Sequence, residues 1–353
     1  MPRWTVYAPI AATVLLVATW SSTPGTLALV IAGAFLVSAV VAAVHHAEVI
    51  AHRVGEPFGS LVLAVAVTVI EVGLIVTLMV SGGESTSTLA RDTVFAAAMI
   101  TLNGIVGISV LIAALRKGTA EFNAEGTATA FATVLALAVL CLVLPSFTTS
   151  APRLQFTGAQ LAFAAVASLV LYGLFVFIQT FRHRDYFLPQ DAGPDEHAEP
   201  PSGREALTSL VLLVLGLVAV VGLAKVESPA VEDLVSSIGA PQSAVGVLIA
   251  LMVLAPETLA AVRNARRNRV QTSFNLAMGS AMASIGLTIP VIAVASIWLD
   301  GPLELGLEPT QLVLLAITAV VGALTVLPGR ATLQEGGVHL VLLAAFVYFA
   351  LVP

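Results

Sequence analysis

Long apolar stretches, separated by short polar or Gly/Pro-containing segments, follow one another along almost the whole chain. A helix needs about 20 apolar residues to cross a bilayer. The seventh stretch is the most irregular, because Lys225, Glu227 and Pro229 interrupt it. We therefore expect an all-α polytopic membrane protein. The pattern predicts eleven transmembrane helices, near residues 4–20, 27–52, 58–81, 92–115, 126–145, 156–181, 205–237, 242–262, 270–298, 309–327 and 334–352.

Composition supports this fold class. Of the 353 residues only 10% are charged and 58% are hydrophobic, whereas a soluble domain carries about 25% charged residues. The net charge of -6 offers no basic surface for nucleic acid. The single cysteine, Cys141, excludes an intrachain disulfide and argues against a metal–thiolate site. We expect no cofactor; the expected partners are the lipid bilayer, inorganic cations and protons, and a homo-oligomer is compatible with the sequence.

The distribution of basic residues predicts the orientation in the membrane, since cytoplasmic loops are enriched in Lys and Arg. With a cytoplasmic N-terminus and eleven alternating helices, twelve of the 15 basic residues fall on the cytoplasmic side. The other three are Arg91, Arg153 and Lys225. We therefore place the N-terminus in the cytoplasm and the C-terminus outside. The first apolar stretch lacks a clear cleavage motif and is expected to be a retained helix rather than a signal peptide.

An internal repeat divides the chain. A glutamate is followed seven residues later by Gly and two further on by Pro, and an apolar helix with one central glutamate comes next. The two copies start at Glu48 and Glu232, and their central glutamates are Glu71 and Glu257. Helices two to six and seven to eleven thus form two units of five. Because five is odd, the second unit enters the membrane inverted, as is typical of secondary transporters.

The repeat defines four parts of the chain. An additional N-terminal helix covers residues 1–26, and the first five-helix repeat covers 27–181. A cytoplasmic acidic linker follows at 182–204, and the second, inverted repeat covers 205–353.

The two central glutamates are the strongest candidates for function. A carboxylate at the centre of a transmembrane helix costs roughly 2.5–3.5 kcal/mol on insertion scales, and such residues mark ion or proton paths. The alternative for each is a protonated glutamate that donates one interhelical hydrogen bond. Two acids at repeat-related positions favour a shared ion site formed by Glu71 and Glu257.

Polar groups near these acids extend the candidate site. Thr68 lies on the same helical face as Glu71. Pro256 cannot donate a hydrogen bond to the carbonyl of Met252, which either becomes a ligand or marks a kink. Serine hydroxyls in membrane helices also bond to their own backbone, so both interpretations stay open for the serines. The helix that follows each central glutamate adds Asn103 in the first repeat, and Ser280 and Ser284 in the second.

Carboxylate, amide, hydroxyl and carbonyl oxygens are hard ligands that suit Ca²⁺ or Na⁺ better than Zn²⁺ or copper. Without a cation, desolvation and mutual repulsion favour the protonated form of two neighbouring carboxyl groups. A divalent cation replaces those protons. Protons and cation therefore compete for one site, which is the minimum requirement for antiport.

A second polar face lies at the cytoplasmic end of helix two. His45, Glu48 and His52 are spaced three and four residues apart, so they share one face of the helix. They are compatible with a metal site, a proton relay, a cation vestibule or gate, or a merely interfacial polar end. Glu232 is the repeat-equivalent of Glu48, on the outer side.

Two segments resemble the cation/Ca²⁺ exchanger superfamily, most closely the proton-coupled bacterial ChaA-type Ca²⁺(Na⁺)/H⁺ antiporters. The first runs HAEVIAHRVGEPFG over 46–59 and continues as VTVIEV over 67–72. The second comprises the Pro-Glu pair at 256–257 and MGSAMASIGLTIP over 278–290. The resemblance covers helices two to eleven.

The resemblance implies that the two repeat glutamates, Glu71 and Glu257, carry the cation and the protons. Calcium/proton exchangers of this superfamily have a Gly-Asn-Ala-Thr-Glu motif in the first repeat and a characteristic Gln in the second. Here the asparagine position is Thr68 and the glutamine position is Ala283. Both changes remove amide oxygens, which leaves the cation preference open.

We therefore expect an antiporter of the bacterial inner membrane, and not an enzyme, that exports cytoplasmic Ca²⁺ in exchange for H⁺ by alternating access. One group of helices would move past a core of helices three, four, eight and nine. The alternatives are a Na⁺(K⁺)/H⁺ antiporter of the same fold, a cation channel, and a membrane metalloenzyme that uses His45, Glu48 and His52.

Overall fold

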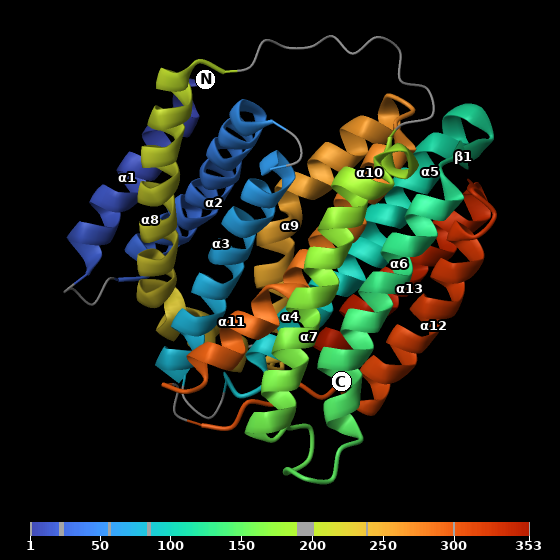
Figure 1. Cartoon of the computed structure of the whole chain (residues 1–353). Coiled ribbons are helices and arrows are strands. Elements are labelled where there is room, and N and C mark those ends of the chain that lie inside the picture. Colours follow the sequence, from blue (N-terminus) through green and yellow to red (C-terminus); the bar gives the residue numbers. More distant parts are fainter. Residues whose placement is uncertain are drawn as a thin grey trace.

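The computed structural model describes residues 2–20, 25–55, 58–82, 86–188, 201–237, 239–298 and 301–352, and it is helical apart from one short pair of strands (Figure 1). The elements are α1 (Arg3–Thr19), α2 (Thr26–Val54), α3 (Phe58–Gly82), α4 (Leu89–Met99), η2 (Ile100–Ile105), α5 (Val106–Lys117), β1 (Thr119–Glu121), α6 (Ala124–Ala138), η3 (Val139–Val143), η4 (Leu144–Ser146), α7 (Gly158–Phe177), η5 (Ile178–Arg182), η6 (Arg184–Phe187), α8 (Gly203–Ser237), α9 (Ser243–Arg266), α10 (Val270–Gly286), α11 (Thr288–Ala295), α12 (Pro309–Val326), β2 (Arg330–Thr332) and α13 (Leu333–Leu351).

The predicted membrane fold is confirmed. Ten helical segments in the described part of the chain are long and apolar enough to cross a bilayer, and α1 is a shorter apolar helix of 17 residues. Several spans combine consecutive elements: α4, η2 and α5 form one span over Leu89–Lys117, and α10 with α11 forms another over Val270–Ala295. Each of the eleven segments corresponds to one stretch predicted from the apolar pattern.

The chain reverses direction at each span, so its loops gather at two ends of the bundle (Figure 1). The N-terminus lies at the same end as the C-terminal ends of α5 and α9. We call this end the basic side, because it receives the twelve basic residues counted above. The C-terminus lies at the opposite side. Helix α3 starts at the basic side and α9 starts at the opposite side, which confirms the inverted arrangement of the two repeats.

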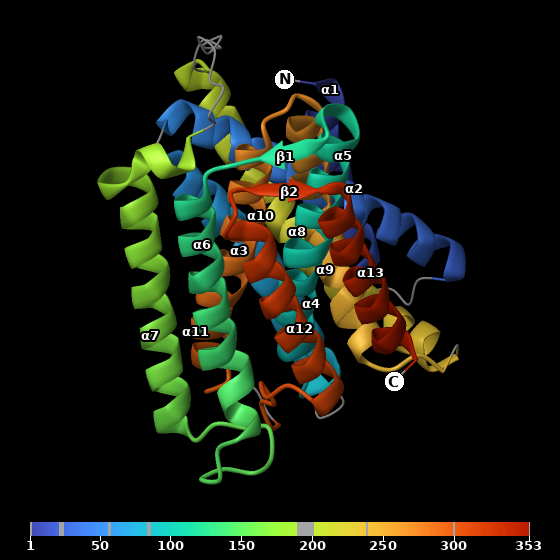
Figure 2. The same cartoon turned by 90° about the vertical axis from the view of Figure 1, so that its right-hand side faces the viewer.

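A two-stranded sheet, which the sequence pattern did not predict, joins two loops on the basic side. Strand β1 pairs antiparallel with β2, with Ala120 opposite Ala331 (Figure 2). Three residues per strand are too few to show an alternating pattern in the sequence. The pairing ties the α5–α6 turn of the first repeat to the α12–α13 turn of the second.

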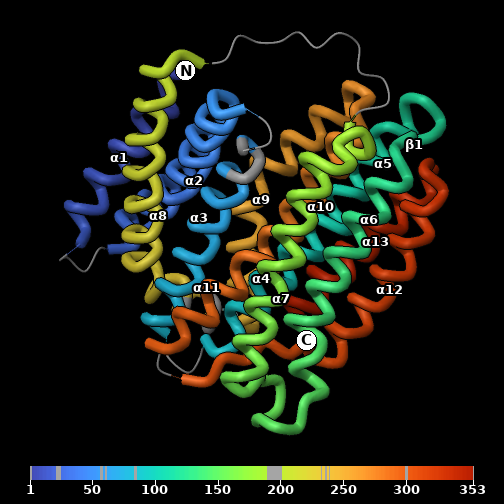
Figure 3. Tube along the Cα trace, in the orientation of Figure 1, coloured from blue at the N-terminus to red at the C-terminus, as the bar shows by residue number. Residues whose placement is uncertain are grey.

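Helices α1, α2 and α8 form one group at the edge of the molecule (Figure 3). The buried side chain of His46 on α2 joins them: its Nε2 lies 2.9 Å from the carbonyl oxygen of Thr5 on α1, and its Nδ1 lies 3.2 Å from Oγ of Ser209 on α8. Leu16 of α1 also packs closely against Gly222 of α8. The additional N-terminal helix is therefore attached to the first helix of each repeat.

The acidic linker predicted at 182–204 is described only in part, because residues 189–200 lie outside the described residues. Its first residues are not simply a solvated linker. Arg184–Phe187 forms the short helix η6, and Phe187 is buried against the bundle. Glu56 and Pro57 of the first repeat motif also lie outside the described residues.

Candidate cation-binding site

The central glutamates of the two repeats line one cavity. Glu71 on α3 and Glu257 on α9 are 4% and 6% exposed. The cavity has a volume of about 360 Å³ and lies among α3, α7, α9 and α10. Inversion of the repeats thus places two acids, 186 residues apart in the sequence, in one buried space.

Glu71 is held by two hydroxyl groups of the second repeat. Ser284 on α10 donates to Oε1 over 2.5 Å, and Thr288 on α11 donates to Oε2 over 3.3 Å. All three side chains are buried. Hydrogen bonds to an ionised acceptor are shorter and stronger than those between neutral groups. Both oxygens of Glu71 therefore have donors suited to a carboxylate.

Glu257 is in a different environment. Its Oε2 is buried and has no hydrogen-bond partner among the described residues, and the same holds for Oγ1 of Thr68 across the cavity lining. A buried polar atom without a partner is costly. A proton or a cation in the cavity would remove that cost, because a cation accepts oxygen ligands from both side chains. These unpaired oxygens indicate a cavity suited to a ligand that binds oxygen atoms.

The cavity continues from the glutamates toward the basic side. Its lining residues come from the middle of the bundle and from the basic-side half of α3, α7 and α10. A Cβ atom added at Gly279 would meet nothing within 4 Å, which shows how open the α10 wall is. Near the basic side the cavity is lined by Gln179, Thr180 and Arg184, and by Thr272 and Asn275.

The structure brings together only part of the set predicted from the sequence. Thr68, Ser280 and Ser284 line the cavity with the two glutamates. Asn103 and Met252 are not among its lining residues, so their predicted place in the site is not reproduced.

Asn103 instead faces α12 and α13. Its Nδ2 donates to Oγ1 of Thr318 over 3.0 Å, and its Oδ1 accepts from Nδ1 of His339, also 3.0 Å away. Asn103 lies in the π-helical turn η2. Such a turn inserts an extra residue and changes which face a side chain occupies. The alignment of the two repeats by sequence alone placed Asn103 on the helix face toward the cavity, and this prediction was wrong.

The face formed by His45, Glu48 and His52 does not line the cavity. The side chain of Glu48 is 48% exposed, and its Oε2 lies 3.9 Å from Nδ1 of His45; His52 is exposed. Among the described residues, no group of three His, Cys, Asp or Glu side chains is arranged to hold a metal ion. The vestibule role of Glu48 stays a prediction. The side chain of Glu232 lies outside the described residues.

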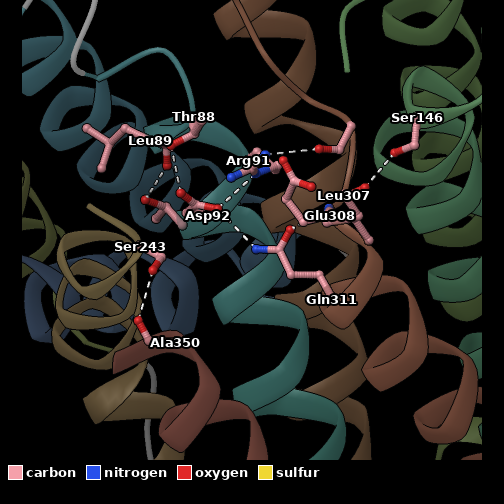
Figure 4. A network of polar contacts seen from close by, with 12 residues as sticks. Thr88, Leu89, Arg91, Asp92, Ser146, Ser243, Leu307, Glu308, Gln311 and Ala350 are labelled. Carbon is pink, nitrogen blue, oxygen red and sulfur yellow. Dashed lines mark hydrogen bonds and ion pairs between the residues drawn. The ribbon is translucent and has the colours of Figure 1, made fainter. Parts of the chain in front are cut away.

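A buried ion pair lies at the start of α4 (Figure 4). Nε of Arg91 donates to Oδ1 of Asp92 over 2.8 Å, and both residues are buried. Thr88 donates to Oδ2 of Asp92 over 2.8 Å, and Gln311 donates to Oδ1 over 3.2 Å. Nη1 of Arg91 also donates to the carbonyl of Gly306. The pair therefore joins the start of α4 to the loop that precedes α12.

Asp92→Asn is expected to destabilise the fold by about 3–5 kcal/mol, because it leaves the guanidinium of Arg91 buried without a counter-charge. The measurement is the apparent melting temperature of the purified protein in detergent. The double variant R91Q/D92N, which removes both charges, should melt closer to the wild type. Equal melting of D92N and the wild type would contradict a stabilising role for the pair.

Comparison with known proteins extends these findings. The family model described as sodium/calcium exchanger protein matches residues 24–181 and 208–352. A putative ionic transporter, y4hA, of Sinorhizobium fredii is 44% identical over 325 residues, covering 92% of this chain and 89% of its own. The sodium-potassium/proton antiporter ChaA of Escherichia coli is 34% identical over 316 residues, covering 88% and 85%. A Ca²⁺/H⁺ antiporter of Aphanothece halophytica is 24% identical over 325 residues, covering 87% and 86%.

Solved structures confirm the fold. The structure of native YfkE aligns with a TM-score of 0.74 at 14% identity and covers 99% of both chains. The H⁺/Ca²⁺ exchanger CAX aligns with a TM-score of 0.65 at 15% identity, covering 98% of this chain and 93% of that one. At these identities the likeness concerns the arrangement of helices.

Proposed function

Because this chain belongs to the sodium/calcium exchanger family, we propose that it is a secondary active antiporter that exports a cytoplasmic cation in exchange for protons. The observation that carries the proposal is the pair Glu71 and Glu257, which line one buried cavity from inverted helices. A permanent pair of buried charges without a counter-ion would be costly. Binding either a cation or protons relieves that cost, so the two ligands exclude each other.

The surroundings of the two acids support different roles in this exchange. Glu71 accepts hydrogen bonds from Ser284 and Thr288 on its two oxygens and is prepared to bind as a carboxylate. Glu257 and Thr68 line the same cavity, and each has a buried oxygen without a hydrogen-bond partner among the described residues. We assign Glu71 as the anchoring ligand and Glu257 as the group that takes up a proton when the cation leaves.

Alternating access would use the division of the helices seen in the fold. The group of α1, α2 and α8 packs along α3 and α9 (Figure 3). Movement of this group past α3 and α9 would open the cavity to one side and close it to the other. With the basic side in the cytoplasm, as the positive-inside rule predicts, the cavity extends toward the cytoplasm and is ready to load the exported cation.

Calcium is the first candidate for that cation, and sodium or potassium is the second. Ca²⁺ takes six to eight oxygen ligands and favours a site with two carboxylates. The monovalent alternative is supported by the 34% identical relative, which is named a sodium-potassium/proton antiporter. It also agrees with Thr68 and Ala283 in the cavity wall, since neither side chain supplies an amide oxygen.

We expect Ca²⁺, and to a lesser extent Na⁺ or K⁺, to drive protons out of acidified everted membrane vesicles that contain this protein. Everted vesicles expose the cytoplasmic face, so the added cation meets the cavity directly. A pH-sensitive dye inside the vesicles measures the rate for each cation. Larger rates with Na⁺ or K⁺ would reverse the order of the two candidates. A cation conductance that persists without a proton gradient and without proton movement would indicate a channel instead.

A further inference from the structure

One basic residue stands at the basic-side mouth of the cavity. Among the described residues that line the cavity, Arg184 is the single base, and Glu71 and Glu257 are the two acids. The other polar lining residues near the mouth, such as Gln179 and Asn275, are neutral. A cation that enters from this side must pass a positive charge before it reaches the two carboxylates.

The position of this charge is set by the packing of η6. Phe187 is 6% exposed, and its carbonyl accepts a hydrogen bond from Nδ2 of Asn275 over 2.6 Å. Tyr186 lies against α6, where a Cβ atom at Gly126 would come within 2.3 Å of the Tyr186 carbonyl oxygen. A hydrogen bond to Glu125 raises the pKa of the Tyr186 phenol above its usual value. The turn that carries Arg184 is therefore anchored to α6 and α10.

The charged residues nearest to Arg184 in the sequence include the acid Asp185. Asp185, Arg182 and His183 are close in sequence, but none of them lines the cavity. None of the ion pairs found among the described residues involves Arg184. Its guanidinium is exposed, so the field is partly screened by water and salt.

We propose that Arg184 is a specificity-determining residue that slows the loading of divalent cations from the cytoplasmic side more than that of monovalent cations, and so narrows the preference for Ca²⁺. The inference rests on the proposed antiport function and concerns the choice of substrate at the same site. The energy of a cation in the field of Arg184 is proportional to the charge of the cation. The arginine therefore lowers the local concentration of Ca²⁺ by the square of the factor by which it lowers that of Na⁺.

The test compares Arg184→Gln with the wild type in everted vesicles, using initial rates at low Na⁺ or Ca²⁺ concentration to obtain kcat/KM for each. We take the entering cation to pass within about 10 Å of the partly screened charge of Arg184. Removal of that charge should then raise kcat/KM about twofold for Na⁺ and about fourfold for Ca²⁺. The Ca²⁺/Na⁺ ratio therefore rises about twofold. Arg184→Glu should raise the ratio about fourfold, and Arg184→Lys should keep it at the wild-type value.

The control is Arg182→Gln, which removes the same charge two residues away at a position outside the cavity lining. It should change the ratio less than Arg184→Gln does, and added impermeant salt should reduce the effect of Arg184→Gln. An unchanged ratio in both Arg184→Gln and Arg184→Glu, with normal flux, would overturn the role of Arg184 but not the proposed antiport function. Absence of cation-driven proton flux in the wild type would overturn the proposed function together with it.

Discussion

Replacing either Glu257 or Glu71 by glutamine is expected to lower cation-driven proton movement at least about 100-fold. Glutamine has nearly the same shape but can neither release a proton nor neutralise a cation. Each substitution therefore removes the competition between the two ligands on which exchange depends. Because hydrogen bonds to charged groups contribute about 1.5–3 kcal/mol, loss of a charged ligand by itself weakens cation binding by roughly 10- to 100-fold. Proton flux in everted vesicles measures the loss.

The matched control is Glu121→Gln, an exposed residue of β1 outside the cavity lining. It should transport at the wild-type rate. All three variants should be present in the membrane at equal amounts and elute alike on size exclusion in detergent. Normal Ca²⁺- or Na⁺-driven proton flux in Glu71→Gln or Glu257→Gln would contradict the assigned mechanism.

The outline of the fold and the centre of the site follow from features that act over long stretches of sequence. The cost of exposing polar backbone to lipid makes each apolar stretch of membrane length a helix. The odd number of helices per repeat then inverts the second unit. Once the units are inverted, Glu71 and Glu257 approach each other because they occupy corresponding positions. The sequence was therefore enough to predict that the two central acids lie together, although not the geometry around them; their role as ligands stays a prediction.

The remaining site residues depend on local departures from regular helix and on contacts between distant segments. The π-helical turn η2 directs Asn103 toward His339, and no signal in the residue pattern marks that turn. Thr288 was missed although it follows Ser284 by four residues, a spacing that places both on one helical face. Arg184 was assigned to a solvated linker because the packing of Phe187, which brings η6 to the cavity mouth, is a tertiary contact.

Removal of the two hydroxyl groups that donate to Glu71 is expected to have the second large effect on transport. The double variant S284A/T288A is expected to raise the KM for the transported cation about 10- to 100-fold, because it removes both donors to the anchoring carboxylate. Without them Glu71 is favoured in its protonated form, so the cation must compete with a proton that is bound more tightly. The loss should therefore be larger at low cytoplasmic pH than at high pH. Initial rates in everted vesicles over a range of cation concentrations and external pH measure both effects.

A control for the removal of a hydroxyl group from a membrane helix is Thr77→Ala, because the partly buried Thr77 lies on α3 with Glu71 and donates to the carbonyl of Gly73 on its own helix. It should keep the wild-type KM and pH dependence. If S284A/T288A lowered the maximal rate and left KM unchanged at every pH, the two hydroxyls would serve a later step of transport instead of binding. The form of the loss in S284A/T288A therefore separates a ligand-positioning role for Ser284 and Thr288 from a role in the movement of the helices.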